Sequence, residues 1–193
     1  MNRQKQMNGY PSIDKPWLKY YSDDVINAPL PEFTIYEYLV DGNWEHPADI
    51  AINYLGRKIT YKGLFENIDR VAAAFLKAGV KPQEIVTVAL PSVPEALYCV
   101  YALNKIGAVA NMVHPLPGTQ EMIFYFNEVQ SRVAVIFDGA YPDIADEIHR
   151  TSVQKAVVVS VADSLSLPLK AAYAMKAGSA RISGTVKPWK DRK

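Results

Sequence analysis

The stretch Ile85-Val86-Thr87-Val88-Ala89-Leu90 decides the fold of this chain. It is a mostly apolar run of strand length, which is typical of a strand that is covered on both faces. The next residues, Ser92-Val93-Pro94-Glu95, have the spacing of a capping box with proline in the first turn, and they predict the start of a helix. Apolar residues at helical spacing continue to Gly107, and a second strand-like run follows at 108–113.

The alternation of strand and helix continues beyond this unit. Right-handed crossovers between such strands produce a mainly parallel sheet with helices on both faces, so we predict a doubly wound α/β domain. After residue 113 we expect a helix over 119–129 capped by Thr119, a strand over 133–137, a helix over 143–150 and a strand over 155–161. A further helix is predicted over 169–176.

Upstream of the first strand, the pattern predicts two helices and a hairpin. Thr34 can cap a helix that ends near Gly42, and residues 51–60 have the pattern of a short hairpin. The following helix has one apolar face at three-four spacing and ends at Gly79, which suits the left-handed cap position.

Residues 1–33 form an arm without periodicity. Its prolines, among them Pro11 and Pro16, discourage a continuous helix. Trp17, Tyr20 and other large apolar side chains predict that the arm packs onto a neighbouring body as a strap.

Composition excludes several classes of protein. A hydrophobic content of 49% and a formal charge of +1 indicate a globular protein without a general attraction to nucleic acid or membrane. The only cysteine, Cys99, excludes an internal disulfide framework and a zinc site built from cysteines. No signal peptide and no apolar run of spanning length is evident, so we expect a cytoplasmic enzyme without an integral membrane segment.

The end of the chain is basic, with seven Lys or Arg and one Asp in residues 166–193. Such a tail can be a phosphate-binding arm, or it can be a solvated segment. Aromatic or glycine-rich interleaving is missing, and we therefore expect no nucleic-acid partner.

The turns that follow the predicted strands lack the glycine-rich loops that bind phosphates. The first of them, Pro91-Ser92-Val93-Pro94, has no glycine and two prolines, so a pyrophosphate cannot approach its backbone closely. This argues against a dehydrogenase and against a P-loop NTPase.

His114 is the best single candidate for a functional residue, since it lies just past a predicted strand where open α/β sheets place their ligands. The alternative is a loop histidine that bonds backbone at a proline-rich turn. Asp138, after the next strand, could bind a ribose or a cation, or could simply belong to an Asp-Gly turn. Cys99 is expected to be a buried core residue, and no spacing predicts a metal site.

Two motifs resemble the first core motifs of the adenylate-forming superfamily, which includes acyl-CoA synthetases. Thr60-Tyr61-Lys62-Gly63-Leu64 is similar to the family's Thr-Tyr-x-x-Leu opening. Leu103-Asn104-Lys105-Ile106-Gly107-Ala108 is similar to its Leu-Lys-x-Gly-Ala pattern, with Ile106-Gly107-Ala108 in register. The pair His114-Pro115 falls near that pattern's terminal proline, and Pro16-Trp17-Leu18-Lys19-Tyr20-Tyr21 resembles acyl-CoA ligases of the long-chain type.

The resemblance implies the first subdomain of the adenylating fold over residues 34–165, and over 166–193 a helix and basic tail that lead to a second subdomain. Family members use ATP, with Mg²⁺, to convert a carboxylate into an acyl-adenylate, commonly followed by transfer to CoA. The family's phosphate loop, adenine motif, ribose-binding Asp and catalytic Lys all follow this subdomain. No catalytic residue can therefore be assigned here, and ATP, Mg²⁺ and CoA are not expected to bind this part alone.

We therefore predict the N-terminal part of an AMP-forming acid–CoA ligase that acts on a fatty or other apolar acid, with His114 near a wall of its CoA or acyl channel. Its expected partners are the second subdomain and the C-terminal lid, and its docking face could also pair two copies. A stand-alone interaction module with the same fold is the main alternative. A cofactor-binding Rossmann domain of another kind is disfavoured by the proline-rich first turn.

Overall fold

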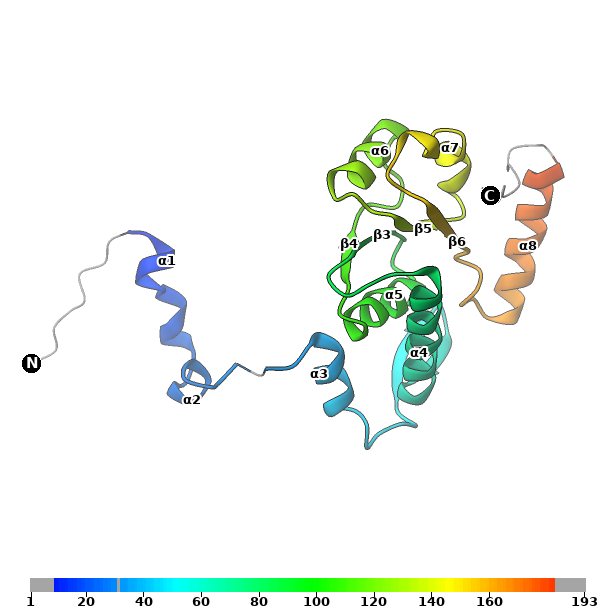
Figure 1. Cartoon of the computed structure of the whole chain (residues 1–193). Coiled ribbons are helices and arrows are strands. Elements are labelled where there is room, and N and C mark those ends of the chain that lie inside the picture. The colour runs from blue at the N-terminus through cyan, green and yellow to red at the C-terminus, as the bar shows by residue number, and fades with distance from the viewer. Residues whose placement is uncertain (1–8, 31, 183–193) are drawn as a thin grey trace, which may run out of the picture. The chain divides into compact units, whose positions relative to one another are not determined.

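The computed structural model describes residues 9–30 and 32–182, and the chain divides into two compact units, Met1–Glu32 and Phe33–Lys193 (Figure 1). The first unit contains α1 (Pro11–Asp14), the 3₁₀ helix η1 (Pro16–Tyr20) and α2 (Asp23–Ile26). Breaks between these short helices confirm that no continuous helix runs through the described part of this arm. Its role as a strap stays a prediction.

The second unit is built on a four-stranded parallel sheet in the order β4-β3-β5-β6. In register, Val88 of the central strand β3 lies beside Met112 of β4 and Val135 of β5. The sequence prediction of a doubly wound α/β sheet is confirmed. The strands span β3 (Ile85–Ala89), β4 (Val109–Met112), β5 (Val133–Phe137) and β6 (Lys155–Val159).

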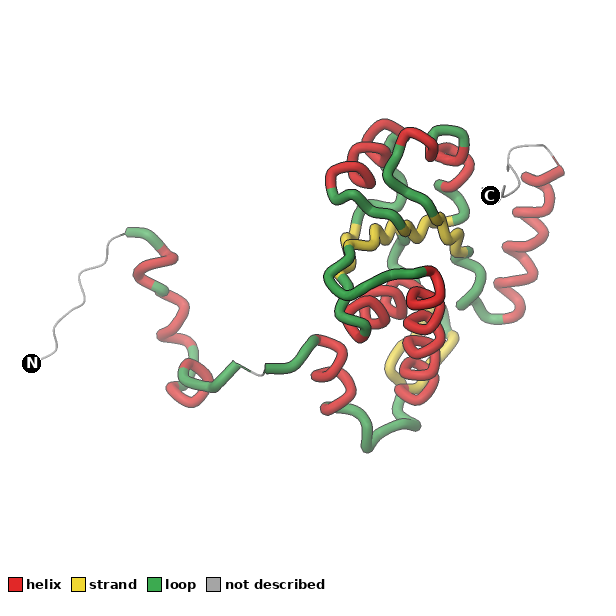
Figure 2. Tube along the Cα trace, in the orientation of Figure 1, coloured by secondary structure: helices red, strands yellow, loops and turns green. Residues whose placement is uncertain are grey.

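Helices cover both faces of this sheet (Figure 2). One face packs against α4 (Tyr61–Ala78) and α5 (Pro94–Lys105), and the other against α6 (Thr119–Glu128) and α7 (Tyr141–Ala145). Side chains of β5 alternate between the two cores, since Val135 belongs to the first and Ile136 to the second. This alternation is the period of two that a strand requires.

A helix and a hairpin precede the sheet; the helix packs against α5 and the hairpin against α4. Thr34 and Glu37 form a complete capping box at the start of α3 (Ile35–Asp41). Strands β1 (Ile50–Tyr54) and β2 (Arg57–Thr60) form the predicted antiparallel hairpin. Gly79 ends α4 in the left-handed conformation with φ 88°, which confirms the predicted cap.

Two predicted helix caps are wrong. Ser92 does not cap α5, because the N-cap residue is Val93 and no side chain bonds the first turn there. Glu95, the other half of the expected capping box, accepts a hydrogen bond from Ser164 instead. Likewise the N-cap of α6 is Gly118, and the hydroxyl of Thr119 donates to the carbonyl of Asp143.

The last elements differ from the prediction mainly in their bounds. The helix expected over 143–150 is divided into α7 and the 3₁₀ helix η2 (Ile148–Arg150). The final helix, α8 (Leu167–Ile182), begins earlier and continues further than residues 169–176. The basic residues after Ile182 lie outside the described part of the chain.

Candidate functional site

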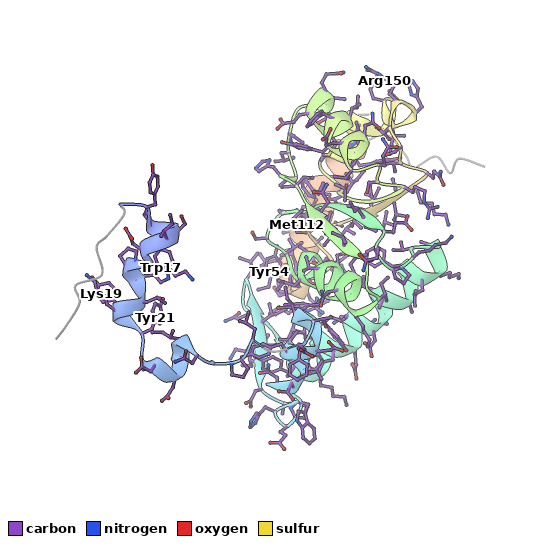
Figure 3. The ribbon with its side chains drawn as sticks, turned by 60° about the vertical axis from the view of Figure 1, so that its left-hand side comes forward. Trp17, Lys19, Tyr21, Tyr54, Met112 and Arg150 are labelled. Carbon is purple, nitrogen blue, oxygen red and sulfur yellow. The ribbon has the colours of Figure 1, made fainter. Side chains whose placement is uncertain are left out.

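The carboxyl end of the sheet opens into a pocket of about 430 Å³ between the β1–β2 hairpin and the start of α5. Figure 3 shows two residues of its wall, Tyr54 from β1 and Met112 from the end of β4. The pocket is lined by Ile52, Asn53, Tyr54, Leu90, Pro91, Ser92, Val93, Pro94, Ala96, Leu97, Val100 and Met112.

The lining determines what this pocket can do. Apart from Asn53, Ser92 and the hydroxyl of Tyr54, its side chains are apolar. Pockets of this size and polarity hold an apolar group of a small molecule. The lining offers neither a cationic side chain for a phosphate nor a nucleophile paired with a base.

His114 lies just beyond β4, on an exposed loop. Its Nδ1 accepts a hydrogen bond from the backbone N–H of Leu116 at 3.2 Å. This is the geometry expected of a loop histidine at a proline-rich turn. The imidazole is not part of the pocket wall, and its role as a ligand-binding residue stays a prediction.

Asp138 follows β5 directly, at the same edge of the sheet, and its N–H donates to the carbonyl of Val159 at 2.9 Å. Its carboxylate accepts the hydroxyl of Tyr173, which lies 3.1 Å from Oδ2 and 3.3 Å from Oδ1. Burial and the neighbouring Asp138 carboxylate raise the pKa of the Tyr173 phenol. Residues 35 positions apart therefore meet here, and no local pattern in the sequence indicates this pair.

Glu95 has a role at this edge that the sequence interpretation missed. Its Oε1 accepts the Ser164 hydroxyl at 2.5 Å, and its Oε2 is buried without a hydrogen-bond partner among the residues that the structure describes. Burial, with a smaller contribution from Glu95, raises the pKa of the Tyr98 phenol. The same two causes raise the pKa of the Cys99 thiol to about 12. Cys99 is buried, as predicted.

The residues of the second motif have structural contacts. Lys105 Nζ lies 2.5 Å from Asp69 Oδ1 and 3.0 Å from the hydroxyl of Tyr36, so it joins α5 to α4 and α3. Asn104 accepts the backbone N–H of Tyr36 at 2.8 Å. Burial opposes the charge of Lys105, but its hydrogen bonds to Asp69 and Tyr36 and the charge interactions with the same two groups together outweigh burial and raise the pKa of the ammonium.

The glycine of this motif turns the chain from α5 into β4. Gly107 adopts φ 73°, a left-handed conformation that favours glycine. Its carbonyl accepts the N–H of Gln83 at 2.7 Å, and the N–H of Ala108 reaches back to Leu103 at 2.9 Å. The motif therefore fixes a helix against the sheet.

Within residues 9–30 and 32–182, no group of three or more His, Cys, Asp or Glu side chains could hold a metal ion. Over the same residues, no helix has the length and hydropathy that crossing a membrane requires.

Comparison with known proteins identifies the family. Residues 42–190 match the sequence profile of the AMP-binding enzyme family. The chain is 26% identical over 160 residues to a long-chain-fatty-acid–CoA ligase of Bacillus subtilis, covering 82% of this chain and 29% of that protein. A 60-residue segment is 47% identical to an acetyl-coenzyme A synthetase of Brucella canis, covering 31% of this chain and 9% of that protein.

The fold also resembles that of a solved long-chain-fatty-acid–CoA ligase of Archaeoglobus fulgidus. The TM-score is 0.64 at 17% identity, over 70% of this chain and 30% of that one. The chain thus spans less than a third of the length of each of these relatives.

Proposed function

The chain belongs to the AMP-binding enzyme family, and from this premise we propose that it is the first subdomain of an ATP-dependent acid–CoA ligase. In that reaction a carboxylate attacks the α-phosphate of ATP, pyrophosphate leaves, and the CoA thiol then displaces AMP from the acyl-adenylate. The observation that carries the proposal is the family match over residues 42–190, together with two motifs whose contacts serve the fold.

The first motif has the same structural character as the second. The Thr60 side chain accepts the N–H of Gly63 at 3.3 Å and caps α4. The Tyr61 and Phe65 rings lie 6.1 Å apart between centroids on the first turns of that helix. Both motifs therefore have structural roles. This agrees with a subdomain that supports the fold while other segments of the enzyme carry the catalytic residues.

The proposed substrate is a fatty or other apolar carboxylic acid. The relative named for long-chain fatty acids matches 82% of this chain, whereas the relative named for acetate matches 31%. The pocket at the carboxyl edge is itself mostly apolar. We place a wall of the CoA or acyl channel near His114, on the exposed loop beside that edge.

The described residues do not fit a nucleoside triphosphate or its Mg²⁺. The turn after β3 contains Pro91 and Pro94, so few backbone N–H groups are free to face a phosphate there. No basic side chain lines the pocket, and no described acidic cluster could hold the cation. We therefore assign ATP, Mg²⁺ and CoA to the whole enzyme and derive no catalytic step through them here.

The proposed partners are the second N-terminal subdomain and the C-terminal lid of the same enzyme, in the cytoplasm. Several apolar side chains are exposed, among them Leu97 and Met112 at the pocket, which are 43% and 49% exposed. This exposure supports a surface that these partners cover in the whole enzyme. A stand-alone interaction module is expected to present a compact polar surface instead.

The first experiment is to read the native gene past the codon for Lys193. We expect the frame to continue into a Ser/Thr/Gly-rich loop with a lysine. The purified 193-residue chain should then show no ATP–pyrophosphate exchange, and the whole gene product should show exchange that depends on a carboxylic acid. A stop codon directly after Lys193, or exchange by the short chain, contradicts the proposal.

A further inference from the structure

Among the side chains of helix α8 that the structure describes, the large apolar ones are mostly exposed. Leu167, Leu169 and Met175 are 84%, 43% and 73% exposed, and Tyr173 is half-buried. In Figure 1 the helix lies at the side of the sheet, beyond β6. Helices of this length are marginally stable in water unless they pack against something. Among the described side chains of α8, the contacts of Tyr173 and of the turn before the helix are therefore the ones that hold it.

The turn that leads into α8 is held firmly. Ala162 and Ser164 are only 7% and 3% exposed. The hydroxyl of Ser164 donates to Glu95 on α5, and Nη1 of Arg57 on β2 donates to the carbonyl of Asp163 at 3.0 Å. Two separate elements thus fix this turn, in addition to the ion pair between Asp163 and Lys170 of the helix that follows.

The contact between the helix and the sheet is polar. The phenol of Tyr173 bonds the carboxylate of Asp138, at the point where β5 ends, and also contacts the side chain of Ser160. That point is also where the order of the strands reverses, because β4 and β5 flank β3 on opposite sides. Open α/β sheets bind their ligands at such a reversal, beyond the carboxyl ends of the strands.

We propose that α8 is a movable helix held closed by a polar contact, which we call the latch. Its base at residues 162–164 stays anchored, and the Tyr173–Asp138 hydrogen bond closes it over the carboxyl end of β5. When the latch is closed, the phenol contacts both carboxylate oxygens of Asp138. When it opens, α8 leaves the sheet and loses helical order, and the carboxylate is free to face this edge of the sheet. This inference does not depend on the proposed enzymatic function.

Hydrogen exchange of two amides tests whether the latch holds α8. The N–H of Lys170 bonds Ser166 within α8, and the N–H of Leu165 bonds Ala162 within the anchored turn. In Tyr173→Phe, we expect the Lys170 amide to exchange roughly tenfold faster, since a hydrogen bond to a charged group is lost. The Leu165 amide should keep its protection.

Tyr125→Phe is the matched control. Tyr125 also donates its phenol to a carboxylate, that of Glu121, but both residues lie on α6 and join no separate elements. This variant should leave exchange in α8 unchanged. Protection of Val135 in the sheet shows whether each variant is folded.

A double-mutant cycle with Asp138→Ala assigns the effect to the pair. If the latch exists, both single variants and the double variant raise exchange of the Lys170 amide to a similar extent. Unchanged exchange in Tyr173→Phe, additive effects in the double variant, or loss of protection at Leu165 along with Lys170 overturns the proposal.

Discussion

At the scale of single residues, the thiol of Cys99 is buried and inert. Its pKa of about 12 follows from desolvation, with Glu95 adding to the shift, so almost no thiolate is present near neutral pH. A free cysteine has a pKa of about 8.5 and reacts readily in mildly alkaline buffer. We expect native protein to resist alkylation by iodoacetamide at about pH 8 and to become labelled once guanidinium unfolds it. Rapid labelling of the folded chain, followed by mass spectrometry, contradicts this burial.

The same scale shows where interpretation of the sequence fails. Cys99 could be predicted as a core residue because its neighbours in the helix are apolar. The partners of Glu95 and Asp138 could not, since Ser164 is 69 residues from the first and Tyr173 is 35 from the second. Local spacing suggested a capping box for Glu95, but the tertiary hydrogen bond took precedence over the local one.

At the scale of elements, two glycines end helices with opposite backbone conformations. Gly79 follows α4 with φ 88°, and a side chain there meets no atom within 4 Å. Gly42 follows α3 in the right-handed region with φ −73°. Gly79→Ala should lower the free energy of unfolding by about 1 kcal/mol through backbone strain alone. Urea unfolding measures the loss.

Gly42→Ala is the control for this prediction. Its backbone conformation suits any residue, and the carbonyl of Tyr38 lies at an ordinary contact distance of 3.5 Å from an added methyl group. We expect this variant to be neutral or slightly stabilised, because alanine restricts the unfolded chain. Equal losses in both variants contradict the assignment to positive φ.

Helices and strands were predicted correctly from the sequence where one physical signal dominates. The apolar residues of α4 recur at helical spacing, and β3 is a short apolar run of strand length, so each pattern predicts its own element. The left-handed cap at the end of α4 needs only a glycine, Gly79. Prediction failed at the start of α5, where proline and a distant partner replace a side-chain cap. It also failed at the division of α7 from η2, which depends on packing between elements.

At the scale of the whole molecule, the described sheet has two edges. Strands β4 and β6 each pair on one side only among residues 9–30 and 32–182. Val109 on β4 and Val157 on β6 are 44% and 43% exposed. Unpaired edges with apolar side chains are templates for pairing with another chain. The second subdomain that we propose would reduce this exposure in the whole enzyme.

We therefore expect the 193-residue chain on its own to self-associate as its concentration rises, measured by sedimentation velocity. Val157→Lys places a charge on the β6 edge and should increase the monomer fraction, since an edge lysine opposes strand pairing. Leu76→Lys is the control: this residue of α4 is 55% exposed but lies on a helix. If both variants increase the monomer fraction equally, the association is due to exposed apolar side chains in general and not to the strand edges. A wild-type chain that stays monomeric at every concentration shows that these edges are already protected.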